Sequence, residues 1–308
     1  MKIILKIILT LFGFKFVHIL RRLKLFISSP VLFLKELHVD IKKDTKFKKK
    51  SSQIIWCAGL PKSGSTLIEQ ILDETNFVDL GKSSLRWFNN FNLDNPHGIS
   101  NQMFLNAPKN GLSFIKTHTH YSKKYLSIAK RHNIKIIVSL RDLRDTLVSQ
   151  VYHIKLDKKH HKHKYLKNLN FENSLIYLIK STFIVNGKKN KTLLYYYNWI
   201  KEWKLLKDKN IIFLWYEDYL KNPKRYIKKI LNFINEKQNS HQKILKKIKT
   251  KSKFQKNLFL KRLNSLGRSK STFREGKMGY YKIYFTQRVE KEFYKIISKK
   301  MLRNVLYK

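Results

Sequence analysis

Short apolar runs along the chain alternate with stretches of helical periodicity. Residues 54–58 are all apolar and are followed by Gly59 and Pro61, which is typical of a buried strand that ends in a turn. Residues 65–73 then place apolar side chains at helical spacing. The remaining predicted strands are residues 113–117, 135–140 and 210–216, and the remaining predicted helices are residues 142–153, 192–207 and 223–235. This alternation predicts the α/β class: three layers, with a mostly parallel central sheet covered by helices on both faces.

The N-terminal region does not follow this pattern. Residues 3–20 are mostly apolar, but Lys6 and Lys15 interrupt them. A membrane-spanning helix needs about 20 apolar residues, and each lysine at its centre costs about 2.5–3.5 kcal/mol. We therefore expect a helix that packs on the protein or lies on an anionic membrane surface, in preference to a spanning helix or a cleaved signal. The predicted organisation is a basic leader, residues 1–50, and one domain, residues 51–308.

Composition excludes some classes of protein but does not identify a binding partner. Hydrophobic residues make up 43% of the 308 residues, which excludes a disordered or fibrous chain. The formal net charge is +46, but 54 of the 66 basic residues are Lys, and Ile and Asn are also abundant. Such a bias resembles A/T-rich coding, so the charge indicates tolerance of anionic substrates more than a nucleic-acid partner. The single cysteine, Cys57, excludes internal disulfides and is compatible with the cytoplasm.

Residues 59–66 (GLPKSGST) lie between the first predicted strand and the first predicted helix. A turn of this kind points backbone N–H groups and a helix N-terminus at one spot, which makes an anion site. The glycine spacing matches a nucleotide P-loop. A P-loop, however, requires a lysine directly before its hydroxyl residue, and here Lys62 lies three residues before Ser65. We therefore expect a phosphate-binding loop that does not hydrolyse nucleoside triphosphates.

Two other segments carry candidate chemistry. Arg141 follows a predicted strand, and Ser149 lies two turns into the next helix, so that both can bind one phosphate. The loop and Arg141 both lie at the carboxyl ends of predicted parallel strands, where open α/β sheets bind ligands. Residues 273–282 (FREGKMGYYK) are, taken alone, only a basic loop that contains glycine.

Together these segments resemble the sulfotransferase family that uses 3′-phosphoadenosine-5′-phosphosulfate (PAPS). Five segments match that family's motifs in order: residues 61–66 its P-K-S-G-T-T loop, residues 116–118 its K-T-H, Arg141 with Ser149 its 3′-phosphate motif, residues 216–223 its Y-E-D…N-P segment, and residues 274–282 its R-K-G-x-x-G-x-W-K loop. The set covers about three quarters of the chain. The sequence departs from the pattern at Leu67, where cytosolic members carry Trp, and at Glu275, where a basic residue is usual.

The resemblance implies a role for each matched residue. His118 would take the proton of the acceptor, Lys62 would stabilise the leaving phosphate, and Lys116 would assist. The implied donor-binding residues are Lys62, Ser63, Gly64, Ser65 and Thr66 at the 5′-phosphosulfate, Arg141, Ser149, Arg274 and Gly276 at the 3′-phosphate, and Tyr216 at the adenine. No metal ion is implied.

The implied function is transfer of a sulfuryl group from PAPS to an acceptor hydroxyl, or an amine, by in-line displacement. The expected acceptor is a small molecule or a carbohydrate, with carbohydrate mildly favoured, and the expected location is the cytoplasm, with contact to the inner membrane face through the N-terminal helix left open. Two alternatives also stay open. A P-loop kinase-like phosphotransferase would require magnesium and ATP, and a non-catalytic binder of nucleic acid or membrane would lose its affinity in salt.

Two clusters invite other interpretations. One cluster resembles a metal site and consists of His160, His161 and His163. Because adjacent histidines in a lysine-rich loop are usually solvated, we expect no metal ion there. We expect the aromatic residues between 195 and 203 to pack in the core, in preference to forming a platform that binds the acceptor. We also expect the lysine-rich insertion, residues 156–191, to border the active site.

Overall fold

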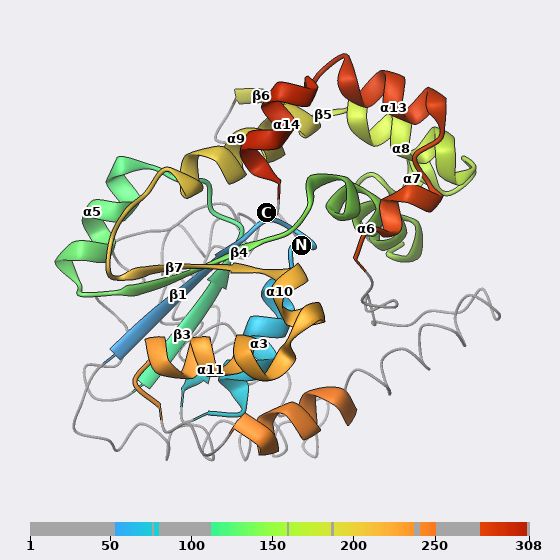
Figure 1. Ribbon diagram of the computed structural model, residues 1–308. Coiled ribbons are helices and arrows are strands. Elements are labelled where there is room, and N and C mark those ends of the chain that lie inside the picture. The colour runs from blue at the N-terminus through green and yellow to red at the C-terminus, as the bar shows by residue number, and fades with distance from the viewer. Residues whose placement is uncertain are drawn as a thin grey trace, which may run out of the picture. The chain divides into compact units, whose positions relative to one another are not determined.

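Figure 1 shows the computed structural model, which describes residues 53–75, 77–79, 112–158, 160–185, 188–236, 241–250 and 278–306. Outside these ranges lie the predicted leader, Arg274 and Gly276, which are predicted to bind the donor, and the departure at Glu275. The described chain forms two compact units. Unit 1 contains the described residues within 1–57 and 72–135, and unit 2 contains those within 58–71 and 136–308.

Unit 1 carries the parallel strands β2 (Val78–Asp79) and β3 (Leu112–Thr117), in which Val78 lies opposite Ser113. The next strand after β3 is β1 (Gln53–Gly59), whose first five residues belong to this unit. Trp56 on β1 is fully buried and donates from Nε1 to Thr117 Oγ1 at 2.9 Å. The last element of the unit is the helix α5 (Lys123–Arg131).

Unit 2 begins with the last two residues of β1 and continues through a loop into α3 (Ser65–Asp73). Its two parallel strands are β4 (Lys135–Leu140) and β7 (Ile211–Trp215), with Leu140 opposite Trp215. Residues 136–140 are all buried, and all but Ser139 are apolar, which is typical of a strand in a parallel sheet. Parallel pairing in both units, with helices between the strands, confirms the predicted α/β class.

Helices follow the strands of unit 2 where the sequence predicted them. Asp142 caps the N-terminus of α6 (Leu143–Leu156), and Asn222 caps α11 (Pro223–Phe233) with its side chain. The other helices and strands of the unit are α7 (His163–Leu166), α8 (Phe171–Lys180), β5 (Thr182–Val185), β6 (Lys188–Lys191), α9 (Thr192–Lys204), α10 (Tyr216–Lys221), a helix over residues 241–250, the 3₁₀ helix η4 (Tyr280–Ile283), α13 (Gln287–Tyr294) and α14 (Lys299–Val305).

The predicted insertion is thus structured: it contains α7, α8 and the antiparallel pair β5–β6. Figure 1 shows α8 beside α13, and Arg288 Nη1 joins them by donating to Asn173 Oδ1 at 3.0 Å. The aromatic residues of α9 are core residues, as expected: the buried side chains are Tyr195, Tyr196, Tyr197, Trp199 and Trp203. Cys57 is also buried. Within the described ranges, no helix has the length and apolar character needed to cross a bilayer.

Candidate functional site

The loop between β1 and α3 has an unusual backbone. Lys62 has a φ of 71° and Gly64 a φ of 98°, and the Ser63 N–H donates to the Leu60 carbonyl at 3.1 Å. The loop leads directly into α3 at Ser65. Because the first N–H groups of a helix have no acceptor within it and the helix dipole is positive there, this end of the loop attracts anions.

Two serines fasten the loop to β4. The Ser63 hydroxyl donates to the Leu60 carbonyl at 2.8 Å and lies 3.1 Å from Ser139 Oγ. In return, the Ser139 hydroxyl donates to the Ser63 carbonyl at 2.8 Å. Both side chains are buried, at 0% and 1% exposed. The Ser63 hydroxyl therefore has a structural role that the sequence did not indicate, and the hydroxyls of Ser65 and Thr66 lie one and two residues into α3.

Tyr216, at the start of α10, packs on the loop. A Cβ atom added to Gly64 would lie 2.8 Å from Cδ2 of the Tyr216 ring, so only glycine allows the ring this close. Beside Tyr216, the Arg141 guanidinium carbon lies 4.7 Å from the ring centroid, a cation–π distance. The structure thus brings together residues from three of the predicted motifs.

Arg141 lies at the end of β4 and is 8% exposed. Its Nη1 donates to the Lys62 carbonyl at 3.2 Å, which ties it to the loop. Its Nε has no hydrogen-bond partner among the residues described. A buried donor without an acceptor costs about 1–3 kcal/mol, more when it is charged, so this position suits an anion. Ser149 lies two turns further along α6 and is partly buried.

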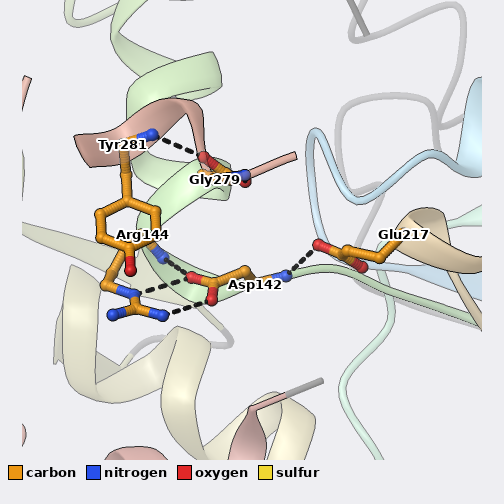
Figure 2. A network of polar contacts seen from close by, with 6 residues as sticks. Asp142, Arg144, Glu217, Gly279 and Tyr281 are labelled. Carbon is orange, nitrogen blue, oxygen red and sulfur yellow. Dashed lines mark hydrogen bonds and ion pairs between the residues drawn. The ribbon is translucent and has the colours of Figure 1, made fainter. Parts of the chain in front are cut away.

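Polar contacts fix the N-terminus of α6, as Figure 2 shows. The Asp142 carboxylate accepts hydrogen bonds from the Arg144 backbone N–H at 2.8 Å and from its guanidinium at 2.7 and 3.0 Å. The Asp142 N–H donates to Glu217 Oε1 at 2.9 Å. Glu217 is 1% exposed, and this burial raises the pKa of its carboxyl to about 7. Its Oε2 has no hydrogen-bond partner within the described ranges.

Asp145 anchors the described part of the third motif. Its carboxylate accepts from the N–H groups of Gly279 at 2.8 Å and Tyr281 at 2.7 Å. The Tyr281 ring faces the Arg144 guanidinium, with 3.8 Å between the guanidinium carbon and the ring centroid (Figure 2). Burial raises the pKa of Asp145, while the charge of Arg141 acts to lower it. The turn that begins at Gly279 is therefore held on the first turn of α6.

Lys116 and His118 belong to unit 1. Lys116 is the fifth residue of β3, and His118 follows the last residue of that strand. Both are half-buried. The residues described above belong to unit 2, so the meeting of His118 with Lys62 stays a prediction from the motif order.

A histidine in the last turn of α6 packs with two histidines that follow the helix. The His153 and His160 rings meet edge to face at 5.7 Å, and His160 stacks on His161 at 4.5 Å. Burial lowers the pKa of His153 and His160 to about 4, and the positive charge of Lys62 acts in the same direction on His153. Among the described side chains, no three His, Cys, Asp or Glu residues form a group that could hold a metal ion.

Comparison with known proteins gives a consistent family. The sequence model of the sulfotransferase domain matches residues 52–304. A crystal structure of a mouse sulfotransferase complexed with PAP is 20% identical, with a TM-score of 0.57 over 84% of this chain and 88% of that chain. Retinol dehydratase in a complex with retinol and PAP is 21% identical, with a TM-score of 0.54 over 87% of each chain. A structure of retinol dehydratase with androsterone and PAP has a TM-score of 0.54 at 20% identity, over 87% of this chain and 86% of that chain. The fold of this chain is the one that these proteins share.

Proposed function

This chain belongs to the sulfotransferase family, and we propose that it transfers a sulfuryl group from PAPS to a hydroxyl, or an amine, of its acceptor. The observation that carries the proposal is Arg141. It is buried, bound to the carbonyl of Lys62, stacked on Tyr216, and has an Nε without a partner among the described residues. A 3′-phosphate would supply the missing acceptor, because arginine binds phosphate through paired N–H groups.

The motif matches imply the remaining donor contacts. The start of α3 offers backbone N–H groups and the hydroxyls of Ser65 and Thr66 to the 5′-phosphosulfate. Tyr216 would lie beside the adenine, with Arg141 already on its ring. Ser149 would donate to the 3′-phosphate, and Arg274 and Gly276 would complete that contact. The related mouse sulfotransferase and retinol dehydratase structures are complexes with PAP, the desulfated donor 3′,5′-diphosphoadenosine, which supports PAPS as the donor.

Catalysis would be mostly positioning and charge stabilisation. The bound donor supplies an activated sulfuryl group on its 5′-phosphate. His118 would accept the proton of the acceptor hydroxyl as the new S–O bond forms. Lys62 would stabilise the negative charge on the bridging oxygen as the bond between sulfur and that oxygen breaks. Lys116 would assist by its charge or by orienting His118.

Thermal unfolding with PAP tests the donor site. At 100 times its dissociation constant, PAP should add about 2.7 kcal/mol to the free energy of unfolding. For a protein of this size the midpoint should rise by roughly 5–10 °C. AMP, which has no 3′-phosphate, should give a much smaller shift, and so should ATP.

The decisive variant is Arg141→Ala, which should lose the shift with PAP. The matched control is Arg225→Ala, since Arg225 is exposed on the first turn of α11 and should be indifferent to PAP. Equal shifts with PAP, AMP and ATP, or an unchanged PAP shift in Arg141→Ala, would contradict the proposed donor site.

A further inference from the structure

The strands β4 and β7 end together beside the candidate site. Leu140 lies opposite Trp215 in the last residue pair of the ladder. The chain continues from these residues into Arg141 after β4 and Tyr216 after β7. Arg141 and Tyr216 are the proposed ligands of the 3′-phosphate and the adenine. Because the ladder ends before them, other contacts must fix their positions relative to each other.

The buried carboxyl of Glu217 supplies such a contact. Glu217 lies on the first turn of α10, directly after Tyr216. Its Oε1 accepts a hydrogen bond at 2.9 Å from the N–H of Asp142, the residue after Arg141 (Figure 2). The Arg141 guanidinium carbon lies 4.7 Å from the centroid of the Tyr216 ring. Two peptide bonds, one hydrogen bond and one cation–π contact thus connect these four residues in a closed ring.

The hydrogen bond acts on the backbone of Arg141 itself. The N–H of Asp142 belongs to the planar peptide group that joins it to Arg141, so its direction fixes the rotation of that group. Without the carboxyl oxygen, this buried N–H would lose its acceptor, and the peptide group would turn toward another one. The guanidinium would then leave its place, because arginine binds phosphate through a rigid planar fork that depends on orientation.

The atom that depends on this orientation is Arg141 Nε, which is buried and has no hydrogen-bond partner among the described residues. The other contact of the guanidinium uses a different nitrogen, Nη1, which donates to the Lys62 carbonyl at 3.2 Å. Contact with the loop and contact with a phosphate are therefore separate functions of the side chain. A change in the backbone of Arg141 can disturb the second.

We propose that Glu217 is a positioning residue for the donor. It holds the peptide group after Arg141 so that Nε faces the 3′-phosphate, and it thereby sets the preference of the site for nucleotides that carry this phosphate. The inference rests on the proposed donor site and adds to it a residue that acts on the nucleotide through Arg141.

Calorimetric titration of the protein with PAP and with AMP at pH 6 tests the inference. Burial raises the pKa of Glu217 to about 7, so at pH 6 its carboxyl is mostly protonated and Glu217→Gln changes its charge little. Glu217→Leu has a similar shape but offers no acceptor to the Asp142 N–H. We expect Glu217→Leu to lower the affinity for PAP by about 10- to 100-fold, the effect of one lost hydrogen bond to a charged group.

The affinity of Glu217→Leu for AMP should fall by less than about threefold, so that the preference for PAP over AMP falls. A merely structural role would weaken both nucleotides alike, because AMP shares the adenine and the 5′-phosphate with PAP. Glu217→Gln keeps an acceptor oxygen, and its preference for PAP should stay within about threefold of that of the unaltered protein.

The matched control is Glu290→Leu, which makes the same change at an exposed position on α13 and should leave both affinities unchanged. If unfolding curves show that Glu217→Leu is not folded, Glu217→Met, with a flexible apolar chain of similar length, takes its place. An unchanged preference in a folded apolar variant, an equal loss of preference in Glu217→Gln, or failure of both apolar variants to fold would overturn the inference. A lack of preference for PAP in the unaltered protein would instead overturn the proposed donor site, and the inference with it.

Discussion

The carboxyl of Glu217 links α10 to the segment after β4. Its Oε1 accepts a hydrogen bond from the Asp142 N–H, and the positive charge of Arg141 acts to lower its pKa. Its pKa rises from 4.5 to about 7 on burial, so between these values the folded protein keeps a proton that the unfolded chain has released. The free energy of unfolding should therefore fall as the pH rises through this window, by up to about 3 kcal/mol. The glutamine of Glu217→Gln still accepts from Asp142 but cannot ionise, so the variant should be the more stable protein at pH 8.

Denaturant unfolding of both proteins at several pH values between 4.5 and 8 measures this difference. The stabilities should converge at the low end of the range, where Glu217 is protonated in both states. Glu290→Gln, at an exposed position on α13, is the matched control and should run parallel to the unaltered protein. A constant difference between Glu217→Gln and the unaltered protein across the range would show that the carboxyl does not titrate as argued.

At the scale of the elements, Asp145 joins α6 to η4 through two backbone N–H groups. In Asp145→Asn the side chain keeps one acceptor oxygen, and its NH₂ group faces the second N–H. We expect amide hydrogen exchange at Gly279 and Tyr281 to accelerate by about 10- to 100-fold, which corresponds to a loss of about 1.4–2.8 kcal/mol. Affinity for PAP should also fall, since this turn continues from the predicted 3′-phosphate loop.

Exchange measured by mass spectrometry on peptides that cover residues 278–283 tests this directly. Asp157→Asn, at the C-terminal end of α6, makes the same chemical change away from the turn and should leave these amides protected. Faster exchange throughout the protein in Asp145→Asn would mean general destabilisation, and would contradict a local anchor.

The elements that could be predicted are those with a strong local pattern. The run of β-branched residues before Arg141 gave β4 with its observed ends, and the spacing from Ser65 to Asp73 gave α3. The strand β6 is Lys-Lys-Asn-Lys and has no apolar residue, so its pairing with β5 left no signal in the sequence. The helix α7 has only four residues, too few for a period to show.

The same limit applies within the site. The positions of Arg141 and Ser149 could be inferred because their motif is local. The burial of Glu217 depends on contacts with Asp142, 75 residues earlier in the chain, and no pattern of neighbours could indicate it. The roles of Ser139 and Asp145 were missed for the same reason, since each binds a distant backbone group.

For the whole molecule, the dominant property is the formal net charge of +46. Repulsion among so many cations destabilises the compact state. Salt screens this repulsion, because the Debye length falls from about 10 Å at 0.1 M to about 3 Å at 1 M. We therefore expect the thermal midpoint of the free protein to rise between 0.1 and 1 M NaCl. The preference for PAP over AMP should persist, because it depends on the buried Arg141 as well as on surface charge.

Calorimetry at the two salt concentrations, with and without each nucleotide, checks both statements. Potassium chloride in place of sodium chloride is the control for effects of a specific ion. A midpoint that falls with salt would mean that attractive surface pairs outweigh the repulsion. Loss of the preference for PAP at 1 M would mean that surface charge alone selects the nucleotide.

Asp145 binds the main chain of the turn and none of its side chains. The attachment therefore asks only for a backbone shape, which Gly279 supplies with its φ of 69°. The two hydrogen bonds to Asp145 therefore survive changes of side chain in residues 280–283, although a change of Tyr281 would remove its ring from the Arg144 guanidinium. Homologues could therefore differ in sequence at these positions and still attach the turn in the same way. A carboxylate at position 145 would indicate that attachment better than the residues of the turn do.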